Sequence, residues 1–442
     1  MNKGKLLTFG IQHLLAMYTG AILVPLIIGG ALKMTPEQIT YLIAIDLFMC
    51  GVATLLQVWK GKVFGIGLPV VLGCTFTAVT PIISIGFEFG IGAIYGSIIA
   101  SGLIIILISG VFGKIVKFFP PIVTGSVVTI IGISLLPTAL NNVAGGQGSK
   151  TFGDVDHFIL AAITLIVIII IYRFTSGFMR AIAILIGMIV GTIAGLLMDV
   201  TSFKVVEEAD AFHMVEFFYF GKPEFLLEPI IVMTLIGMVS LVESTGVYYA
   251  LSDITKKKIN SKDLARGYRS EGLSSVLGGL FNAFPYTTYS QNVGLVKMTG
   301  VKERSVIFVT GALLVVLGFL PKFAAVTQVI PTAVLGAAMV AMFGLVITQG
   351  MQMLAPEIAK SMENSLIVAC AVGLGVGVSV VPDLFKGMPA TFASMLANGT
   401  PSYVVTFLEM VVTLVSNGIV IGSLTAIILN ILFNMIGKKK AV

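Results

Sequence analysis

The sequence predicts an all-α protein that crosses a membrane many times, and three observations lead to this fold class. Charged residues make up only 11 % of the 442 residues, whereas a soluble globular protein carries about 25 %. Hydrophobic residues make up 57 %, and the mean hydropathy is +1.04. The apolar runs, such as 159–172 and 181–198, are continuous, which argues against the alternating pattern of a membrane barrel. So few charges cannot cover a water-exposed surface, and a soluble fold is excluded.

A membrane-spanning helix needs about 20 apolar residues, and charged or Gly/Pro-rich breaks divide the chain into fourteen segments near this length. The basic start followed by an apolar stretch to Leu32 is too long for a signal peptide, so we interpret it as a retained first helix. The third and tenth segments are short and interrupted, and the last contains a possible break near Asn417-Gly418. The predicted spans are 6–30, 39–59, 68–85, 91–112, 120–139, 157–173, 178–198, 226–251, 265–283, 286–300, 303–320, 325–350, 364–381 and 403–436.

The distribution of basic residues supports this count and predicts the orientation. With a cytoplasmic N-terminus and fourteen crossings, the inner loops hold 21 of the 27 Lys and Arg residues, including Lys117 and Lys438–Lys440. Such an excess on the cytoplasmic side is typical of membrane proteins, so the net charge of +6 does not indicate nucleic-acid binding. We therefore expect a multi-pass protein of the cell (inner) membrane with both termini in the cytoplasm. The six basic residues left outside are Lys33, Lys150, Lys204, Lys222, Lys322 and Lys386.

The chain also has the organisation of an inverted repeat. Seven predicted spans precede the acidic segment 199–228 and seven follow it, which places the two halves in opposite orientations. In each half the third span is interrupted: Gly and Pro break 65–81 in the first, and the segment 282–294 is polar in the second. Short, broken spans at matching positions of two halves indicate a binding site near the middle of the membrane.

Acidic residues inside apolar spans are the first candidates for such a site, because each costs several kcal/mol at membrane depth. Glu243 lies about 20 Å along its helix from the basic cluster that begins at Lys256, well inside the hydrocarbon. It is predicted to bind substrate or a proton. Glu271 has either a functional role or an ion pair with the nearby Arg269, whereas Asp46 and Glu409 are as readily explained by hydrogen bonds between helices.

Polar side chains without charge complete the candidate site. His13, in the first span, is predicted to support the site structurally. Gln291 and Asn292 place two amides at the broken tenth span, and an amide both donates and accepts hydrogen bonds. This pattern matches a ring C=O beside an N–H, as in a lactam or imide. No Lys or Arg lies at the midplane, which argues against sulfate, phosphate or carboxylate substrates.

The sequence gives no indication of enzyme chemistry. It contains none of the nucleotide-binding, metalloprotease or hydrolase motifs, so neither catalysis nor a cofactor nor a metal is expected. The three cysteines, Cys50, Cys74 and Cys370, lie in apolar segments without metal spacing and are interpreted as small packing residues.

The segment Gln291-Asn-Val-Gly294-Leu-Val-Lys-Met-Thr299-Gly300 resembles the signature [Q/E/P]-N-x-G-x-x-x-x-T-[R/K/G] of the nucleobase–ascorbate transporter family, also called nucleobase:cation symporter-2. Gln12-His13, the segment 73–76, the segment 243–246 and Glu271 resemble further landmarks of that family, and the likeness runs from Phe9 to Gly437. Within the family, the chain resembles bacterial xanthine permeases.

This resemblance implies a fourteen-helix fold in which spans 3 and 10 each carry a short antiparallel strand. It also implies a core domain of spans 1–4 and 8–11 (residues 1–117 and 224–320) and a gate domain of spans 5–7 and 12–14 (residues 118–223 and 321–442). Many family members are homodimers, so a dimer is possible here too.

The resemblance further implies the roles of individual residues. Glu243 and Gln291 would bind the substrate through their side chains, and Phe76 and Ser290 through their backbones. Glutamine at position 291 resembles the purine branch (xanthine, urate), whereas uracil-type members carry glutamate there. Several members have Asp where Glu271 stands, and some have a basic residue in place of Gly300. The supporting and proton-coupling residues would be Glu271, Asn292, His13, Gly294 and Thr299.

The expected function is therefore proton-coupled import of xanthine or a close oxopurine. Three alternatives remain at this point: a carrier of uracil or another nucleobase, an anion transporter of similar architecture, and, from another class, a channel or membrane-embedded enzyme, which no motif favours. Sodium coupling is an alternative to proton coupling.

Overall fold

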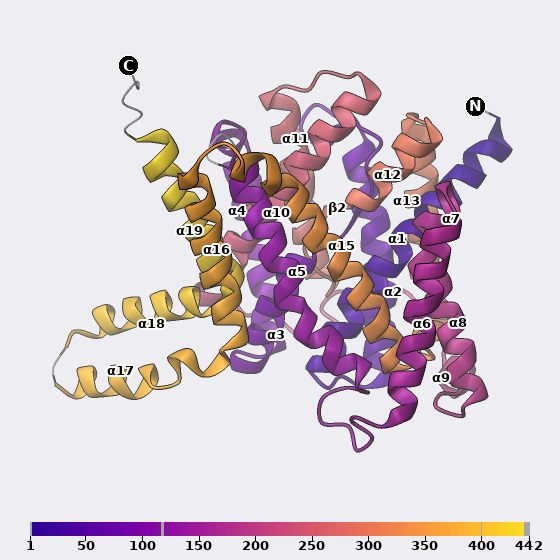
Figure 1. The fold of residues 1–442 in the computed structure, drawn as a ribbon, viewed down its shortest axis with the longest axis horizontal. Coiled ribbons are helices and arrows are strands. Elements are labelled where there is room, and N and C mark those ends of the chain that lie inside the picture. Colours follow the sequence, from indigo (N-terminus) through magenta and orange to yellow (C-terminus); the bar gives the residue numbers. More distant parts are fainter. Residues whose placement is uncertain (1, 116–118, 399, 437–442) are drawn as a thin grey trace. The chain divides into compact units, whose positions relative to one another are not determined.

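The computed structural model describes residues 2–115, 119–398 and 400–436, and within these ranges it is mostly helical (Figure 1). The chain forms two compact units. The first unit comprises Met1–Lys114 and Pro137–Met342, and the second comprises Ile115–Leu136 and Phe343–Val442. Two helices, α5 (Pro121–Val143) and α15 (Thr332–Ile358), contribute several residues to each unit.

The first unit contains most of the helices and a two-stranded sheet. Its helices are α1 (Lys3–Ala31), α2 (Pro36–Val58), α3 (Val79–Glu88), α4 (Ile91–Ile115), α6 (Val155–Phe174), α7 (Gly177–Ala181), α8 (Ala183–Leu197), α9 (Lys204–Glu208), α10 (Leu227–Thr255), α11 (Ser261–Leu280), α12 (Ser290–Thr299), α13 (Arg304–Gly318) and α14 (Pro321–Gln328). The second unit continues with α16 (Met362–Val380), α17 (Met388–Ala397), α18 (Ser402–Ser416), α19 (Gly418–Asn430) and a π-helical turn, Ile431–Met435.

Local sequence explains several helix boundaries. The Thr35 side chain accepts a hydrogen bond from Gln38 N, and the Gln38 side chain accepts one from Thr35 N, which begins α2 with a capping box. Asn260 and Asp263 form the same arrangement at the start of α11. Helix α10 ends where Lys256 adopts a left-handed conformation with φ of 59°.

Nine helices among the described residues are long and apolar enough to cross a membrane. In addition, α13 and α14 together form an apolar pair that bends by 81°. The prediction of a multi-pass membrane protein is confirmed, and the break near Asn417-Gly418 is observed between α18 and α19. Fourteen spans, the inverted repeat and cytoplasmic termini stay predictions. Of the basic residues used for that orientation, Lys117 and Lys438–Lys440 lie outside the described residues.

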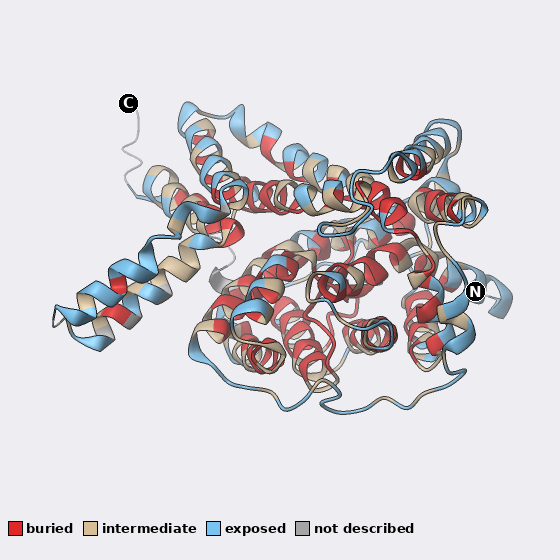
Figure 2. Cartoon of the chain, turned by 90° about the horizontal axis from the view of Figure 1, so that it is seen from below, coloured by how far each residue is buried: buried red, intermediate tan, exposed pale blue. Residues whose placement is uncertain are grey.

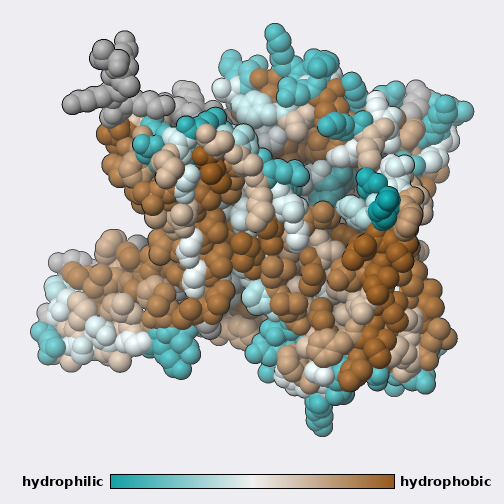
Figure 3. Space-filling model, viewed as in Figure 1, coloured by the Kyte–Doolittle hydropathy of each residue, from teal (hydrophilic) through white to brown (hydrophobic). Residues whose placement is uncertain are grey.

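The exterior of α6 and α8 is suited to contact with lipid. Their surface is largely hydrophobic in Figure 3, and Ile166, Ile169, Ile189 and Ile193 are each more than half exposed. In the second unit, α17 and α18 form a hairpin that is mostly exposed in Figure 2. A small apolar core there comprises Ile122, Val123, Leu354, Ile367, Ala371 and Ala426.

The two interrupted spans meet in the sheet of the first unit. Strand β1 (Leu72–Cys74) pairs antiparallel with β2 (Tyr286–Thr288), with Leu72 opposite Thr288 and Cys74 opposite Tyr286. The strand pair that the family resemblance implied is therefore present. At the central position only glycine fits, because a Cβ on Gly73 would lie 2.5 Å from a ring carbon of Tyr289.

The predicted core and gate domains have different boundaries from the two compact units. Helices α6, α7 and α8 were assigned to the gate at 118–223, but they pack within the first unit together with the predicted core helices. The core–gate division describes which parts move during transport, whereas the compact units follow internal packing. The division therefore stays a prediction, and its boundary at 117/118 lies outside the described residues.

Candidate functional site

The strand pair places the starts of two half-length helices beside each other. Strand β1 is followed by the 3-10 turn η1 (Phe76–Ala78) and α3, and β2 is followed at once by α12. The first N–H groups of a helix have no partner within it, and the helix dipole makes this end electropositive. Half-helices that begin inside a membrane commonly present these ends to a polar substrate.

Helix α10 carries Glu243 past the same strand pair. Its next residue, Ser244, accepts a hydrogen bond from Thr288 N (3.3 Å) and lies 3.0 Å from the Thr287 hydroxyl. Helix α10 also packs against both η1 and α12. The elements that bear Glu243, Phe76 and Gln291 therefore meet at one place in the first unit.

The predicted site residues divide into an accessible group and a buried group. The residues expected to contact substrate are half-buried or exposed, namely Glu243, Phe76, Ser290 and Gln291. Those expected to support them by hydrogen bonding are each only 2 % exposed, namely Glu271, Asn292 and His13. The residues predicted to bind substrate are therefore more accessible than those predicted to support them.

Glu271 lies at the centre of the buried support. One carboxylate oxygen accepts a hydrogen bond from Ser244 Oγ (2.9 Å), and the other accepts one from the Tyr248 hydroxyl. Through Ser244 the carboxylate is connected to β2, and through Tyr248 to the side chain of Gln57 on α2. The alternative of an ion pair with Arg269 is not what the structure shows, because Arg269 Nε donates to Ser109 Oγ (3.0 Å).

His13 and Asn292 connect α1 with α12. The Asn292 amide nitrogen donates to His13 Nδ1 (3.1 Å) and lies 2.9 Å from the His13 carbonyl oxygen. Since Nδ1 accepts, the ring proton of neutral His13 is assigned to Nε2. The pair fixes α12 next to the exposed Gln291 side chain, which agrees with a supporting role for both residues.

This contact leads to a quantitative prediction. Asn292→Ala removes both hydrogen bonds and is expected to lower the initial rate of substrate uptake by about 10-fold, whereas His13→Ala removes only one and has a smaller effect. Because the two act through one contact, the double variant should resemble Asn292→Ala alone. Thr8→Ala, on the exposed face of α1, is the control. Strictly additive losses in uptake would show that the two residues act independently.

The second half of the signature motif ends α12. Thr299 Oγ1 donates to the Leu295 carbonyl (2.7 Å) and accepts from Val301 N (3.3 Å). Gly300 then adopts a left-handed conformation with φ of 66°. Gly294 is exposed on α12, and a Cβ there would meet no other atom within 4 Å. The structure thus gives Thr299 a helix-capping contact, away from the strand pair.

Asp46, which the sequence analysis explained by a hydrogen bond between helices, belongs to a buried cluster beside β2 whose other members the sequence did not predict. Asp46 on α2 is fully buried and accepts hydrogen bonds from the Tyr286 hydroxyl (3.0 Å) and from Cys50 Sγ (3.6 Å). Asp46 is therefore a link between α2 and the strand pair, and Cys50 is one helical turn along. Glu409, by contrast, is exposed on α18 in the second unit. The sequence signal for this cluster was a carboxylate, Asp46, that lies four residues before Cys50 in one apolar span.

Comparisons with known proteins extend over nearly the whole chain. A model of a family described as "Permease family" matches residues 4–384. The chain is 56 % identical over 439 residues to "Xanthine permease" of Bacillus subtilis (strain 168), covering 99 % of this chain and 96 % of the relative. It is 54 % identical over 440 residues to "Nucleobase transporter PlUacP" of Paenibacillus larvae, covering 100 % and 97 %. It is also 55 % identical to "Uric acid permease PucK" of Bacillus subtilis, covering 98 % and 96 %.

Solved structures with low sequence identity share the fold. The transmembrane domain of the cyanobacterial bicarbonate transporter BicA has a TM-score of 0.63 at 16 % identity, covering 86 % of this chain and 98 % of that one. The structure of SLC26A9 has a TM-score of 0.57 at 14 % identity, covering 82 % and 61 %. At such identities the likeness concerns the fold alone. The similar proteins are permeases and transporters by name and not enzymes.

Proposed function

Because the chain belongs to the permease family, as a nucleobase–ascorbate transporter similar to bacterial xanthine permeases, we propose that it imports xanthine or a close oxopurine such as urate by proton symport. The observation that carries this proposal is the accessible pair Glu243 and Gln291, on two elements that meet at the strand pair and are backed by buried polar contacts.

The chemistry of these two side chains suits the edge of an oxopurine. A carboxylate accepts hydrogen bonds from ring N–H groups, and an amide both donates to a ring C=O and accepts from a neighbouring N–H. The starts of α3 and α12 add backbone N–H donors near Phe76 and Ser290 for further carbonyl oxygens of the ring. A flat, polar and largely uncharged heterocycle therefore satisfies every group that the site presents.

Glu243 also provides a means of coupling. A carboxylate that binds the substrate as an anion and is protonated before the loaded carrier changes conformation leaves the moving site neutral, which lowers the cost of carrying charge through a low-dielectric region. Glu271 would hold Ser244, and hence α10, in the binding arrangement. Alternating access would follow from movement of the core (1–117 and 224–320) against the gate (118–223 and 321–442), in a monomer or a homodimer of the cell membrane.

Uptake of radiolabelled xanthine by cells that lack their own purine permeases tests this function directly. The expected result is accumulation above the external concentration, which an uncoupler abolishes and sodium removal does not affect. Flux that stops at equilibrium would indicate a channel, and persistence of accumulation with the uncoupler would refute proton symport.

Selectivity for oxopurines is expected to depend on the amide of Gln291. Replacing Gln291 by Glu removes the N–H donor, so xanthine uptake should fall by about 10-fold and uracil uptake should become detectable. Gln147→Glu, in an exposed loop, is the charge-matched control. Unchanged relative rates for xanthine and uracil in the Gln291→Glu variant would contradict the proposed contact.

The fold likeness to BicA and SLC26A9 makes an anion transporter the second candidate. A cationic group at the helix starts would favour an anion, and residues 72–78 and 282–296 contain neither Lys nor Arg. Competition of labelled xanthine uptake by unlabelled xanthine, uracil and sulfate separates the candidates. We expect xanthine to compete and sulfate to have no effect.

A further inference from the structure

A pocket of about 130 Å³ lies in the first unit, immediately beyond the ends of α2 and α10. Three separate parts of the chain line it: Lys60 with the loop 66–68, the segment 257–259 with Asp263, and Arg304 at the start of α13. The pocket is large enough for a group several times the size of a water molecule. It is distinct from the strand pair and is not part of the proposed transport site.

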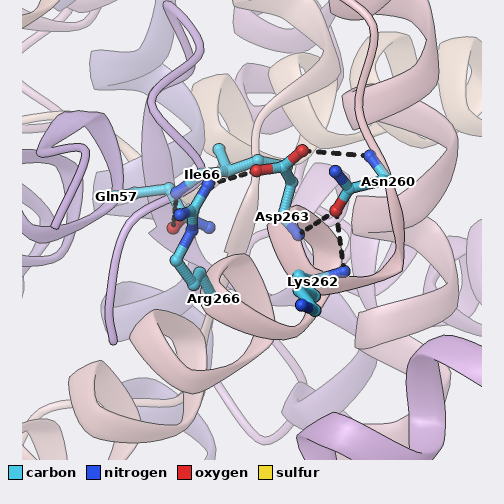
Figure 4. A network of polar contacts seen from close by, with 6 residues as sticks. All are labelled: Gln57, Ile66, Asn260, Lys262, Asp263 and Arg266. Carbon is cyan, nitrogen blue, oxygen red and sulfur yellow. Dashed lines mark hydrogen bonds and ion pairs between the residues drawn. The ribbon is translucent and has the colours of Figure 1, made fainter. Parts of the chain in front are cut away.

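The pocket has a strong excess of positive charge. Four cations line it, Lys60, Lys257, Lys258 and Arg304, against a single carboxylate. That carboxylate, Asp263, already accepts hydrogen bonds from Arg266 and from Asn260 N (3.0 Å), as Figure 4 shows.

None of the four cations forms an ion pair with any residue that the structure describes. Arg304 makes one long hydrogen bond, from Nη1 to the Val58 carbonyl (3.4 Å). Four like charges around one cavity repel each other, and a bound anion relieves this repulsion.

The loop 66–68, which lines the pocket, is held in place by hydrogen bonds to neighbouring residues. Gln57 accepts a hydrogen bond from Ile66 N through its side chain (3.4 Å) and one from Gly67 N through its carbonyl (3.2 Å), the former drawn in Figure 4. Gly65 N donates to Ser270 Oγ (2.7 Å). A Cβ on Gly65, which has φ of 84°, would lie 1.4 Å from the Trp59 carbonyl oxygen, so only glycine permits this loop. A ligand would therefore meet a fixed surface.

Two simpler explanations account for part of this charge. Lysines are abundant in cytoplasmic loops, and cations stabilise the electronegative C-terminal ends of helices such as α2 and α10. Neither explanation accounts for the fact that cations from three separate segments line one cavity and form no ion pair with a described carboxylate. Convergence of this kind is what a binding site for an anion requires.

We propose that this pocket binds the phosphate group of an anionic ligand, either the phosphodiester headgroup of an anionic phospholipid or a soluble phosphate. Lysine ammonium groups are common ligands of phosphate as point charges, and arginine binds its oxygens in a fork. The pocket lies where two helices long and apolar enough to cross a membrane end, and basic pockets at the headgroup level of a membrane bind anionic lipids.

The single tryptophan of the chain provides a local probe. Trp59 directly precedes Lys60 and is 64 % exposed. The full-length protein in nonionic detergent is titrated with dihexanoyl phosphatidylglycerol, dihexanoyl phosphatidylcholine or sodium phosphate at constant ionic strength, and tryptophan fluorescence is recorded. Native mass spectrometry of the same protein counts bound phosphatidylglycerol.

The test variant is Lys257→Gln/Lys258→Gln/Arg304→Gln, which leaves Lys60 beside the fluorophore. The matched control, Lys3→Gln/Lys5→Gln/Lys302→Gln, removes the same charge from exposed positions outside the pocket. Gln57 is left unchanged because its side chain also contacts Tyr248.

We expect saturable binding of phosphatidylglycerol, weakened by roughly 100-fold in the test variant and by less than about twofold in the control. A response to phosphatidylglycerol alone identifies a lipid headgroup, and an equal response to sodium phosphate identifies a soluble phosphate. Equal responses to phosphatidylcholine, or wild-type binding by the test variant, would overturn the proposal. So would the absence of a fluorescence response together with unchanged phosphatidylglycerol counts in the mass spectra. Because every readout is binding, the result is independent of whether the protein carries xanthine.

Discussion

Replacing Glu243 by Gln is expected to abolish uphill xanthine uptake while the protein remains in the membrane. The amide cannot carry a proton across, and it replaces a charge-assisted hydrogen bond to the substrate that contributes about 1.5–3 kcal/mol. Binding should therefore weaken by about 10- to 100-fold. Labelled xanthine uptake at steady state, normalised to protein in isolated membranes, measures the effect.

Glu409→Gln is the matched control for this variant. Glu409 is also a carboxylate in an apolar helix, but it is exposed on α18 in the second unit. Its replacement should leave uptake within about twofold of wild type, as is usual for surface substitutions. Wild-type accumulation by Glu243→Gln would remove Glu243 from both proposed roles, in binding and in coupling.

Replacing Glu271 by Ala is expected to reduce both stability and transport. The change leaves the hydroxyls of Ser244 and Tyr248 without their acceptor in a buried region, at a cost of about 1–3 kcal/mol for each group. Because Ser244 also accepts from Thr288 N, the contact of α10 with β2 should loosen. We expect a fall of several degrees in the thermal unfolding midpoint in detergent and at least a 10-fold loss of uptake.

Glu271→Gln separates hydrogen bonding from charge. The amide keeps one acceptor for Ser244 and presents a donor to the Tyr248 oxygen, so the unfolding midpoint should recover most of its wild-type value. If transport recovers as well, Glu271 acts as a positioning residue. If stability recovers and transport does not, Glu271 itself takes part in coupling. An unchanged midpoint in Glu271→Ala would contradict the support that the hydrogen bonds imply.

The sequence predicted the parts of the molecule that depend on local composition. Continuous apolar runs predicted the bounds of α1, α2, α4 and α10 to within a few residues. A segment inside lipid must form all its backbone hydrogen bonds within itself, and a continuous apolar run does so as a helix. The sequence also predicted the break near Asn417. In the structure the Asn417 side chain caps the start of α19.

The contacts among the site residues could not be predicted in the same way. Glu271 was assigned a possible ion pair with Arg269 because the two are near in sequence, but residues two apart on a helix do not face each other. Its true partners, Ser244 and Tyr248, lie on another helix, 27 and 23 residues earlier respectively. Likewise nothing in the local pattern around Asp46 indicates Tyr286, which lies 240 residues away. Such partners depend on tertiary packing.

The pairing of β1 with β2 has a consequence for biosynthesis. The partner of Leu72 is Thr288, so the peptide groups of β1 have no strand to bond until the second half of the chain emerges from the ribosome. At about 5–20 residues per second this interval is roughly 10 to 40 s. During that time the nascent segment carries unsatisfied backbone groups that hydrocarbon does not tolerate. We therefore expect residues 65–78 to wait at the insertion machinery or in a water-filled vestibule, so that the first half cannot mature before its counterpart is made.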